Sequence, residues 1–294
     1  MNIALTGASG FIGSAIARHA HKNGHKVTAL VRESSNRKNI EPYVTSFIVA
    51  EQGDPSVFSE FLDGADVVIH NSYDWSVMRN KGLMAHLNSN LLGSISLLEA
   101  SEQRHFIFLS SIAVHHHMHA NWNGTIDESH PTRPGSFYGA YKASVEAHMW
   151  AANASRGQQV TSLRPTAVYG LDPVLKRTIG YPIVQTIREG KPITKLGGGK
   201  FVNVEDVAAV AIACIDNPKA SPCVYNLANC YARWSDWATI AAELLHANVE
   251  IDMSSPPAPK NTFDTADVTK DLGIELNRGI DDIRKAIEEL ILAT

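Results

Sequence analysis

Short apolar runs rich in β-branched residues alternate with amphipathic segments through the first half of the chain. The apolar runs are typical of buried strands, which are expected at Ile3–Leu5, Lys26–Val31, Ser46–Ala50, Asp66–His70, His105–Ser110 and Val160–Arg164. The amphipathic segments predict helices between them, at Ser14–Asn23, Pro55–Leu62, Leu83–Ser101 and Tyr138–Ser155. Nearly continuous apolar strands that alternate with helices predict an α/β fold with a doubly wound parallel sheet.

The pattern loosens after Pro165, where proline and glycine become frequent as far as Gly199. Further elements are expected at Ile179–Glu189, Val202–Asn217, Cys223–Leu227, Ser235–His246 and Ile280–Leu292. Because Cys223–Leu227 again has the pattern of a strand, two lobes are expected to interleave along the chain. Residues 1–165 and 201–228 are predicted to form the larger domain, and residues 166–200 and 229–294 a smaller mixed lobe.

Composition is that of an ordinary globular protein, with 44% hydrophobic and 19% charged residues. A net charge of −4 offers no basic field, so neither nucleic acid nor a membrane surface is an expected partner. The first residues lack the basic and apolar regions of a leader peptide, and no apolar run reaches the roughly 20 residues of a membrane span. Cys214, Cys223 and Cys230 show no metal-type spacing, which is typical of reduced thiols in a cytoplasmic protein.

A glycine-rich stretch, Thr6–Gly13, follows the first expected strand and opens the first helix. Glycines there allow a sharp turn and a close approach to a pyrophosphate, whose charge the helix N-terminus favours. An ordinary tight turn is the alternative, but the strand–turn–helix context favours a dinucleotide site of the Rossmann type. The residues expected to contact the cofactor are Gly7, Ser9, Gly10, Phe11, Ile12 and Gly13. The larger domain is thus the expected NAD(P)-binding domain, and the smaller lobe the substrate-binding one.

The end of the second strand, about 20 residues beyond the glycines, is where NAD enzymes carry an acid for the ribose hydroxyl. This chain has Arg32 at that position, and Glu33 follows only after it. A guanidinium suits a 2′-phosphate through charge-assisted hydrogen bonds, whereas the alternative is a solvated basic loop. The sequence therefore favours NADP(H) as the cofactor, with NAD(H) as the alternative.

Tyr138 and Lys142 are four residues apart in a predicted helix, which places them on one face a turn apart. A neighbouring ammonium is expected to lower the pKa of the tyrosine, so that the pair could exchange a proton with a secondary alcohol during hydride transfer. Ser111 follows an apolar strand, and a hydroxyl at the carboxyl end of a parallel strand faces the ligand crevice. The sequence predicts Ser111, Tyr138 and Lys142 as the catalytic set.

Taken in order, these motifs resemble the extended short-chain dehydrogenase/reductase family, also called the NAD-dependent epimerase/dehydratase family. The matching segments cover nearly the whole chain and are Thr6–Gly13, Asp66–His70, Asn90–Gly93, Tyr138–Lys142, Arg164–Gly170 and Val202–Val207. The resemblance implies that Glu51 lies near the adenine and that Lys142 and Pro165 contact the cofactor. It also implies the catalytic roles of Ser111, Tyr138 and Lys142, and a homodimer through four helices as a possible assembly.

Departures from the family pattern narrow the expected reaction. Ser111 is followed by Ile112-Ala113, where sugar-nucleotide 4,6-dehydratases carry an Asp-Glu pair, so dehydration is not expected. Lys200 alone stands where sugar-nucleotide enzymes usually have an arginine for the diphosphate. His115 occupies a position where many members have tyrosine, and Tyr73 follows the fourth strand. Tyr73, His115 and Lys200 are the expected substrate-binding residues.

The histidines at 115, 116, 117 and 119 invite a metal site, but no acid or cysteine completes it, and no metal is expected. The leading hypothesis is an NAD(P)-dependent oxidoreductase that interconverts a ketone and a secondary alcohol. A nucleotide-sugar 4-epimerase with tightly bound NAD uses the same residues and is the first alternative. A non-catalytic NADP(H)-sensing protein is the other, although a sensor has no use for the Ser–Tyr–Lys set.

Overall fold

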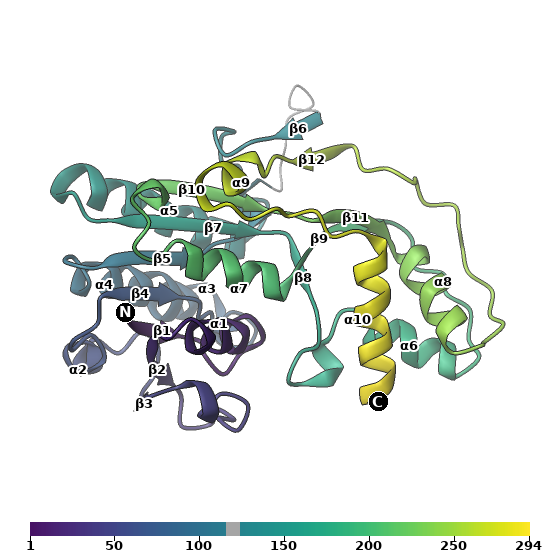
Figure 1. The fold of residues 1–294 in the computed structure, drawn as a ribbon, viewed down its shortest axis with the longest axis horizontal. Coiled ribbons are helices and arrows are strands. Elements are labelled where there is room, and N and C mark those ends of the chain that lie inside the picture. The colour runs from purple at the N-terminus through teal and green to yellow at the C-terminus, as the bar shows by residue number, and fades with distance from the viewer. Residues whose placement is uncertain (116–123) are drawn as a thin grey trace.

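The computed structural model of the protein describes residues 1–115 and 124–294. Its centre is a seven-stranded, all-parallel sheet in the order β10-β7-β5-β4-β1-β2-β3 (Figure 1). The strands are β1 (Asn2–Thr6), β2 (Lys26–Val31), β3 (Ser46–Val49), β4 (Val67–His70), β5 (His105–Leu109), β7 (Val160–Pro165) and β10 (Cys223–Leu227). The order reverses direction between β1 and β4, and ligands of open α/β sheets bind at such a switch point.

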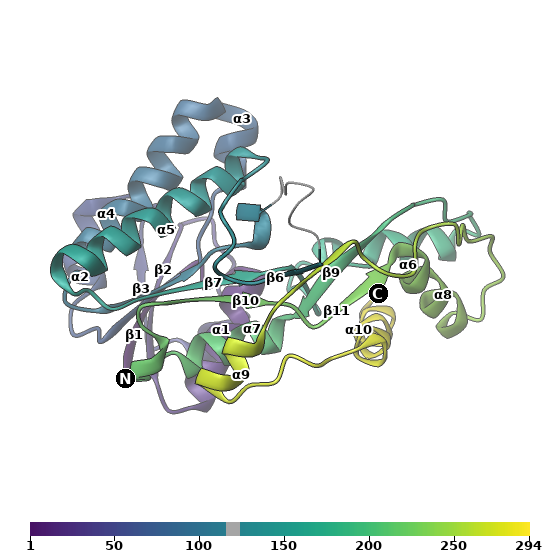
Figure 2. The same cartoon turned by 90° about the horizontal axis from the view of Figure 1, so that it is seen from above.

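Helices cover both faces of this sheet, as Figure 2 shows from above. One face carries α1 (Phe11–Lys22), α7 (Val204–Ala213) and α9 (Ala266–Leu272). The other carries α2 (Phe58–Phe61), α3 (Trp75–His86), α4 (Gly93–Ala100) and α5 (Phe137–Arg156). Each layer buries its own apolar cluster against the sheet, which explains why the strands are apolar on both sides. The expected doubly wound α/β fold is confirmed.

The smaller lobe surrounds a three-stranded mixed sheet of β8 (Ala167–Tyr169), β9 (Gly198–Asn203) and β11 (Cys230–Arg233). Three helices pack on it around Trp237 and Phe201, namely α6 (Tyr181–Arg188), α8 (Trp234–Leu244) and α10 (Ile280–Ala293). A two-stranded parallel sheet joins β6 (Gly124–Ile126) to β12 (Asn261–Phe263). The exact division of the chain into two domains stays a prediction, because β9 belongs to the small sheet and leads directly into α7.

The helix expected at Leu83–Ser101 is longer and less regular than its sequence pattern indicates. It begins at Trp75, where the Asp74 side chain accepts hydrogen bonds from the first turn, and Gly82 interrupts α3 with a φ of 82°. A π-helical segment, Leu87–Leu92, then connects α3 to α4. π-Helical turns often occur at functional sites, and this one carries the buried Asn90.

Candidate active site

The loop between β1 and α1 has the geometry of an anion cradle. Gly7 has a φ of +70°, and a Cβ at Gly13 would lie 2.0 Å from the backbone oxygen of Gly7, so no other residue fits there. Gly10 caps α1 without a side-chain hydrogen bond, which leaves the first N–H groups of the helix to an external acceptor. This chain therefore fits a dinucleotide pyrophosphate at Gly7–Gly13.

The structure brings Ser111, Tyr138 and Lys142 together at the carboxyl end of β5. Ser111 lies two residues beyond the end of that strand, where its Oγ accepts from the Ala113 N–H at 3.1 Å and its hydroxyl acts to lower the pKa of Tyr138. Lys142 lies one helical turn beyond Tyr138, with its Nζ buried 5.6 Å from the centre of the tyrosine ring and donating to the backbone oxygen of Leu109. The three side chains thus form one compact group between β5 and α5.

Gly139 makes this arrangement possible and was not singled out from the sequence. A Cβ at Gly139 would lie 2.4 Å from the backbone oxygen of Ala113, so α5 approaches the segment after β5 more closely than any other residue permits. The start of α5 is fixed by Ser136, whose hydroxyl accepts from the Gly139 N–H at 3.1 Å. A glycine directly after Tyr138 was the available sequence signal for this close contact.

The electrostatics of the pair differ from the sequence-based expectation. Burial raises the pKa of Tyr138 to about 12, and the nearby Ser111 hydroxyl only partly opposes this effect. Burial also lowers the pKa of Lys142 to about 7, although the nearby Glu146 carboxylate acts in the other direction. Because both groups are driven toward their neutral forms, the expected lowering of the pKa of Tyr138 by an adjacent ammonium is not found in this structure.

Aromatic side chains from the segment after β4 surround Tyr138. Tyr73 meets the Tyr138 ring edge-on at a centroid distance of 4.9 Å, and Trp75 stacks on it at 4.9 Å with an interplanar angle of 26°. Tyr73, an expected substrate residue, therefore lies beside the tyrosine that the sequence predicts to be catalytic. Trp75 also lies against Tyr138, and its place in the first turn of α3 follows from the helix cap formed by Asp74.

An ion pair between Arg32 and Asp74 lies at the expected adenosine end of the cofactor site. Arg32 extends from the end of β2, and its Nη1 lies 3.2 Å from Oδ2 of Asp74. Glu51 is exposed just beyond β3, and Pro165 is the buried last residue of β7. Asp74 was missed by sequence reasoning, because its helix-capping pattern gave no indication that it would meet an arginine of another strand.

Two of the expected substrate residues, His115 and Lys200, have other partners. The His115 ring is buried, with its Nε2 at 3.0 Å from Nη1 of Arg164, and burial lowers its pKa to about 4. Lys200 Nζ donates to Oδ1 of Asn261 at 2.7 Å. Both side chains also lie against Phe263 of β12. The ring centres of His115 and Phe263 are 6.3 Å apart, and Nζ of Lys200 is 5.7 Å from the centre of the Phe263 ring. Their roles at the substrate stay predictions.

The remaining histidines of the expected cluster, at 116, 117 and 119, lie outside the described residues. Within residues 1–115 and 124–294, no three His, Cys, Asp or Glu side chains lie close enough together to hold a metal ion. In the same ranges no helix is long and apolar enough to cross a membrane.

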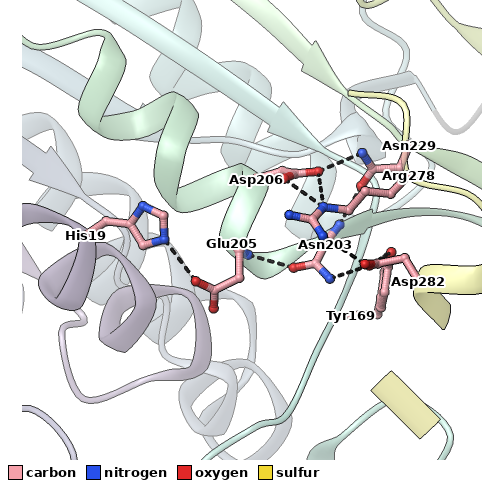
Figure 3. A network of polar contacts seen from close by, with 8 residues as sticks. All are labelled: His19, Tyr169, Asn203, Glu205, Asp206, Asn229, Arg278 and Asp282. Atoms are coloured by element: carbon pink, nitrogen blue, oxygen red, sulfur yellow. Dashed lines mark hydrogen bonds and ion pairs between the residues drawn. The ribbon is translucent and has the colours of Figure 1, made fainter. Parts of the chain in front are cut away.

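A cavity of about 520 Å³ lies between α1, the end of β8 and α10, and Phe11, Gly170 and Asn203 contribute to its wall. Figure 3 shows the polar network beneath it. Asp282 of α10 accepts from the Tyr169 hydroxyl at 2.5 Å, and Arg278 bridges Asp282 to Asp206 of α7. Ser111, Tyr138 and Lys142 do not line this cavity, and the network connects α10 of the small lobe to α7 on the central sheet.

Comparison with known proteins agrees with this geometry. The NAD dependent epimerase/dehydratase family matches residues 3–228. A putative dihydroflavonol 4-reductase of Synechocystis is 25% identical over 88% of this chain and 74% of its own length. A UDP-glucose 4-epimerase of Vibrio cholerae is 26% identical over 76% of this chain and 69% of its own length.

Solved structures agree on the fold. The UDP-glucose 4-epimerase of Thermotoga maritima, solved with UDP-glucose, superposes with a TM-score of 0.83 at 20% identity, covering 100% of this chain and 99% of its own. The UDP-glucuronic acid 4-epimerase of Bacillus cereus, solved with UDP-glucuronic acid and NAD, has a TM-score of 0.82 at 22% identity and covers both chains fully. The family match, the Rossmann-type sheet and the assembled Ser–Tyr–Lys group agree: the chain is an oxidoreductase enzyme that belongs to the NAD dependent epimerase/dehydratase family.

Proposed function

We propose that the protein is an NADPH-preferring reductase that interconverts a ketone and a secondary alcohol. The observation that carries this proposal is the group of Ser111, Tyr138 and Lys142 at the end of β5, beside a glycine loop that fits a dinucleotide. The nicotinamide cofactor, when bound, supplies or accepts the hydride. Everything else in the reaction is assigned to side chains of this chain.

Tyr138 acts as the acid in the reducing direction. Because its pKa is raised to about 12, the phenol is protonated at neutral pH and available to a carbonyl oxygen. Ser111, at the carboxyl end of β5, orients that oxygen by a hydrogen bond from its hydroxyl. Lys142 is held beside the ring by the backbone oxygen of Leu109, and in its protonated form it would favour the phenolate that remains after proton transfer.

Cofactor preference is the finer part of the proposal, and it rests on Arg32. The guanidinium lies at the end of β2, where an acid would bind the ribose of NAD, and nearly half of the side chain is exposed to an incoming phosphate. We expect Arg32→Ala to weaken NADPH binding roughly 10- to 100-fold, because a hydrogen bond to a charged group contributes about 1.5–3 kcal/mol, and to leave NADH binding nearly unchanged.

Calorimetric titration of the apo protein with NADPH and NADH, after a check for co-purified cofactor, measures this directly. Lys38→Ala, which removes a nearby exposed cation, is the control for a general loss of positive charge. A wild type that prefers NADH, or one that is purified with NAD already bound, would contradict NADPH preference. That result would favour the epimerase alternative, for which the 26% identity to a UDP-glucose 4-epimerase is the supporting observation.

We further propose that the protein is a homodimer through the faces of α3, α4 and α5, which lie side by side in Figure 2. These helices and the turn between them expose large apolar side chains, at Trp75, Leu83, Met84, Leu92, Phe137 and Trp150. Clusters of exposed apolar side chains on a folded protein commonly mark an interface.

Met84→Asp is expected to convert the dimer to monomers, because it places a charge in the apolar interface. Light scattering coupled to size-exclusion chromatography measures the mass. Met253→Asp, at an exposed methionine outside these helices, is the matched control and should leave the mass unchanged. A wild-type protein that is monomeric at micromolar concentration would exclude this assembly.

All three cysteines are free, which is consistent with the reducing cytoplasm as the proposed location.

A further inference from the structure

Asp74 is held in a fixed position at the start of α3. Its Oδ1 accepts from the N–H and the hydroxyl of Ser76, at 2.9 and 2.6 Å. Its backbone is bound twice by Asn90, whose Oδ1 accepts from the Asp74 N–H at 2.8 Å and whose Nδ2 donates to the Asp74 carbonyl at 3.2 Å. The carboxylate therefore has little freedom to move, and its second oxygen, Oδ2, is the one directed at Arg32.

Arg32 is the more exposed partner of this pair. Its side chain is 48% exposed, against 11% for Asp74. Burial acts to raise the pKa of Asp74, but the hydrogen bonds from Ser76 and the charge of Arg32 outweigh it and bring the pKa below its ordinary value. At neutral pH a fixed negative charge thus lies 3.2 Å from the guanidinium that the proposed function assigns to a 2′-phosphate.

We propose that Asp74 is a specificity-determining residue that limits the preference for a 2′-phosphorylated cofactor at the Arg32 subsite. This inference rests on the proposed NADPH-binding role of Arg32. A phosphate monoester of charge about −1.5 to −2 must draw Arg32 away from Asp74 and then lie close to the carboxylate. A ribose with free hydroxyls meets no such repulsion, so the charge of Asp74 weakens the binding of NADPH and leaves that of NADH unaffected.

Asp74→Asn tests this with little change in shape, because Asn and Asp are about equally good helix caps. Calorimetric dissociation constants are measured for NADPH, NADH and the fragment 2′,5′-ADP. We expect NADPH and 2′,5′-ADP to bind roughly tenfold more tightly to the variant, as for the removal of one like charge several ångströms away at a partly exposed site. NADH binding is expected to change less than twofold. Unchanged or weaker NADPH binding would overturn the inference, and weaker binding would mean that Asp74 positions Arg32 for the phosphate.

Asp54 provides a matched control. Its Oδ1 accepts from the N–H and the hydroxyl of Ser56 at 2.9 and 2.6 Å, the same capping arrangement, and no ion pair joins it to a described residue. Asp54→Asn should leave both dissociation constants unchanged. Thermal unfolding of the Asp54 and Asp74 variants checks that the caps are retained.

Arg32→Ala separates the failure of this inference from the failure of the proposed cofactor. If Arg32→Ala leaves the ratio of NADPH to NADH affinity unchanged, the Arg32 subsite itself is refuted. If Arg32→Ala weakens NADPH binding while Asp74→Asn leaves it unchanged, only the role of Asp74 is refuted. In the Arg32→Ala background, Asp74→Asn should increase NADPH affinity by less than tenfold. Part of the tenfold increase in the wild-type background comes from releasing the Arg32 guanidinium, which this background lacks.

Discussion

Replacing Tyr138 by phenylalanine is expected to lower kcat for ketone reduction by roughly 10²- to 10⁴-fold, the usual contribution of a positioned general acid. The variant loses only a hydroxyl at the ring that Ser111 and Lys142 face, and the stacking of Trp75 and Tyr73 on that ring is retained. Cofactor affinity and thermal stability should therefore change little while turnover falls.

The measurement is steady-state NADPH oxidation with a carbonyl compound that the wild type turns over, found by screening ketones and aldehydes. Tyr141→Phe is the matched control, since it removes the same atom three residues later from a buried ring whose hydroxyl meets Ser94 at 2.9 Å. It should retain kcat within a few fold. Wild-type turnover in Tyr138→Phe would exclude this tyrosine as the acid.

The second large effect is expected on stability, at the buried pair of Glu146 and Arg164. Both side chains are 4% exposed, and the carboxylate accepts from the guanidinium at 2.7 and 3.0 Å and from the Ser162 hydroxyl at 2.7 Å. Glu146→Ala leaves the Arg164 charge buried without its anion. We expect it to lower the free energy of unfolding by about 3–5 kcal/mol.

Urea denaturation followed by circular dichroism measures this loss. Glu99→Ala is the control, because Glu99 pairs with Arg156 at 2.8 Å but is 58% exposed, and such surface pairs contribute only about 0–1 kcal/mol. The double variant Glu146→Leu/Arg164→Met should be more stable than Glu146→Ala, since it removes both charges together. A loss below about 1 kcal/mol in Glu146→Ala would show that solvent reaches Arg164 in solution.

The central sheet could be predicted from the sequence because its strands are apolar on both faces and alternate with helices. The pattern gave Lys26–Val31 and Cys223–Leu227 with the bounds that the structure has. The small sheets could not be predicted in this way. β6 and β12 have three residues each, too few to show a period, and they pair across a sequence separation that no local pattern reveals.

For the candidate site, spacing predicted that Tyr138 and Lys142 share a helix face, and the apolar pattern of 105–110 predicted that Ser111 lies at the carboxyl end of a strand. The pKa values of Tyr138 and Lys142 could not be predicted, because they depend on burial by rings such as that of Phe108, whose centre lies 4.4 Å from Nζ of Lys142. The contact between Arg32 and Asp74 could not be predicted from the sequence either, since it depends on how the loops after β2 and β4 meet at the carboxyl end of the sheet.

The position of β10 in the sheet has a consequence for biosynthesis. β10 pairs with β7 and closes that side of the sheet, and α7 covers α1, yet both elements follow the excursion through β8 and α6. At about 5–20 residues per second, a ribosome needs roughly 3–12 s to translate from Pro165 to Leu227. During that interval the nascent chain exposes an unpaired strand edge and an apolar helix face, which are the surfaces that chaperones bind.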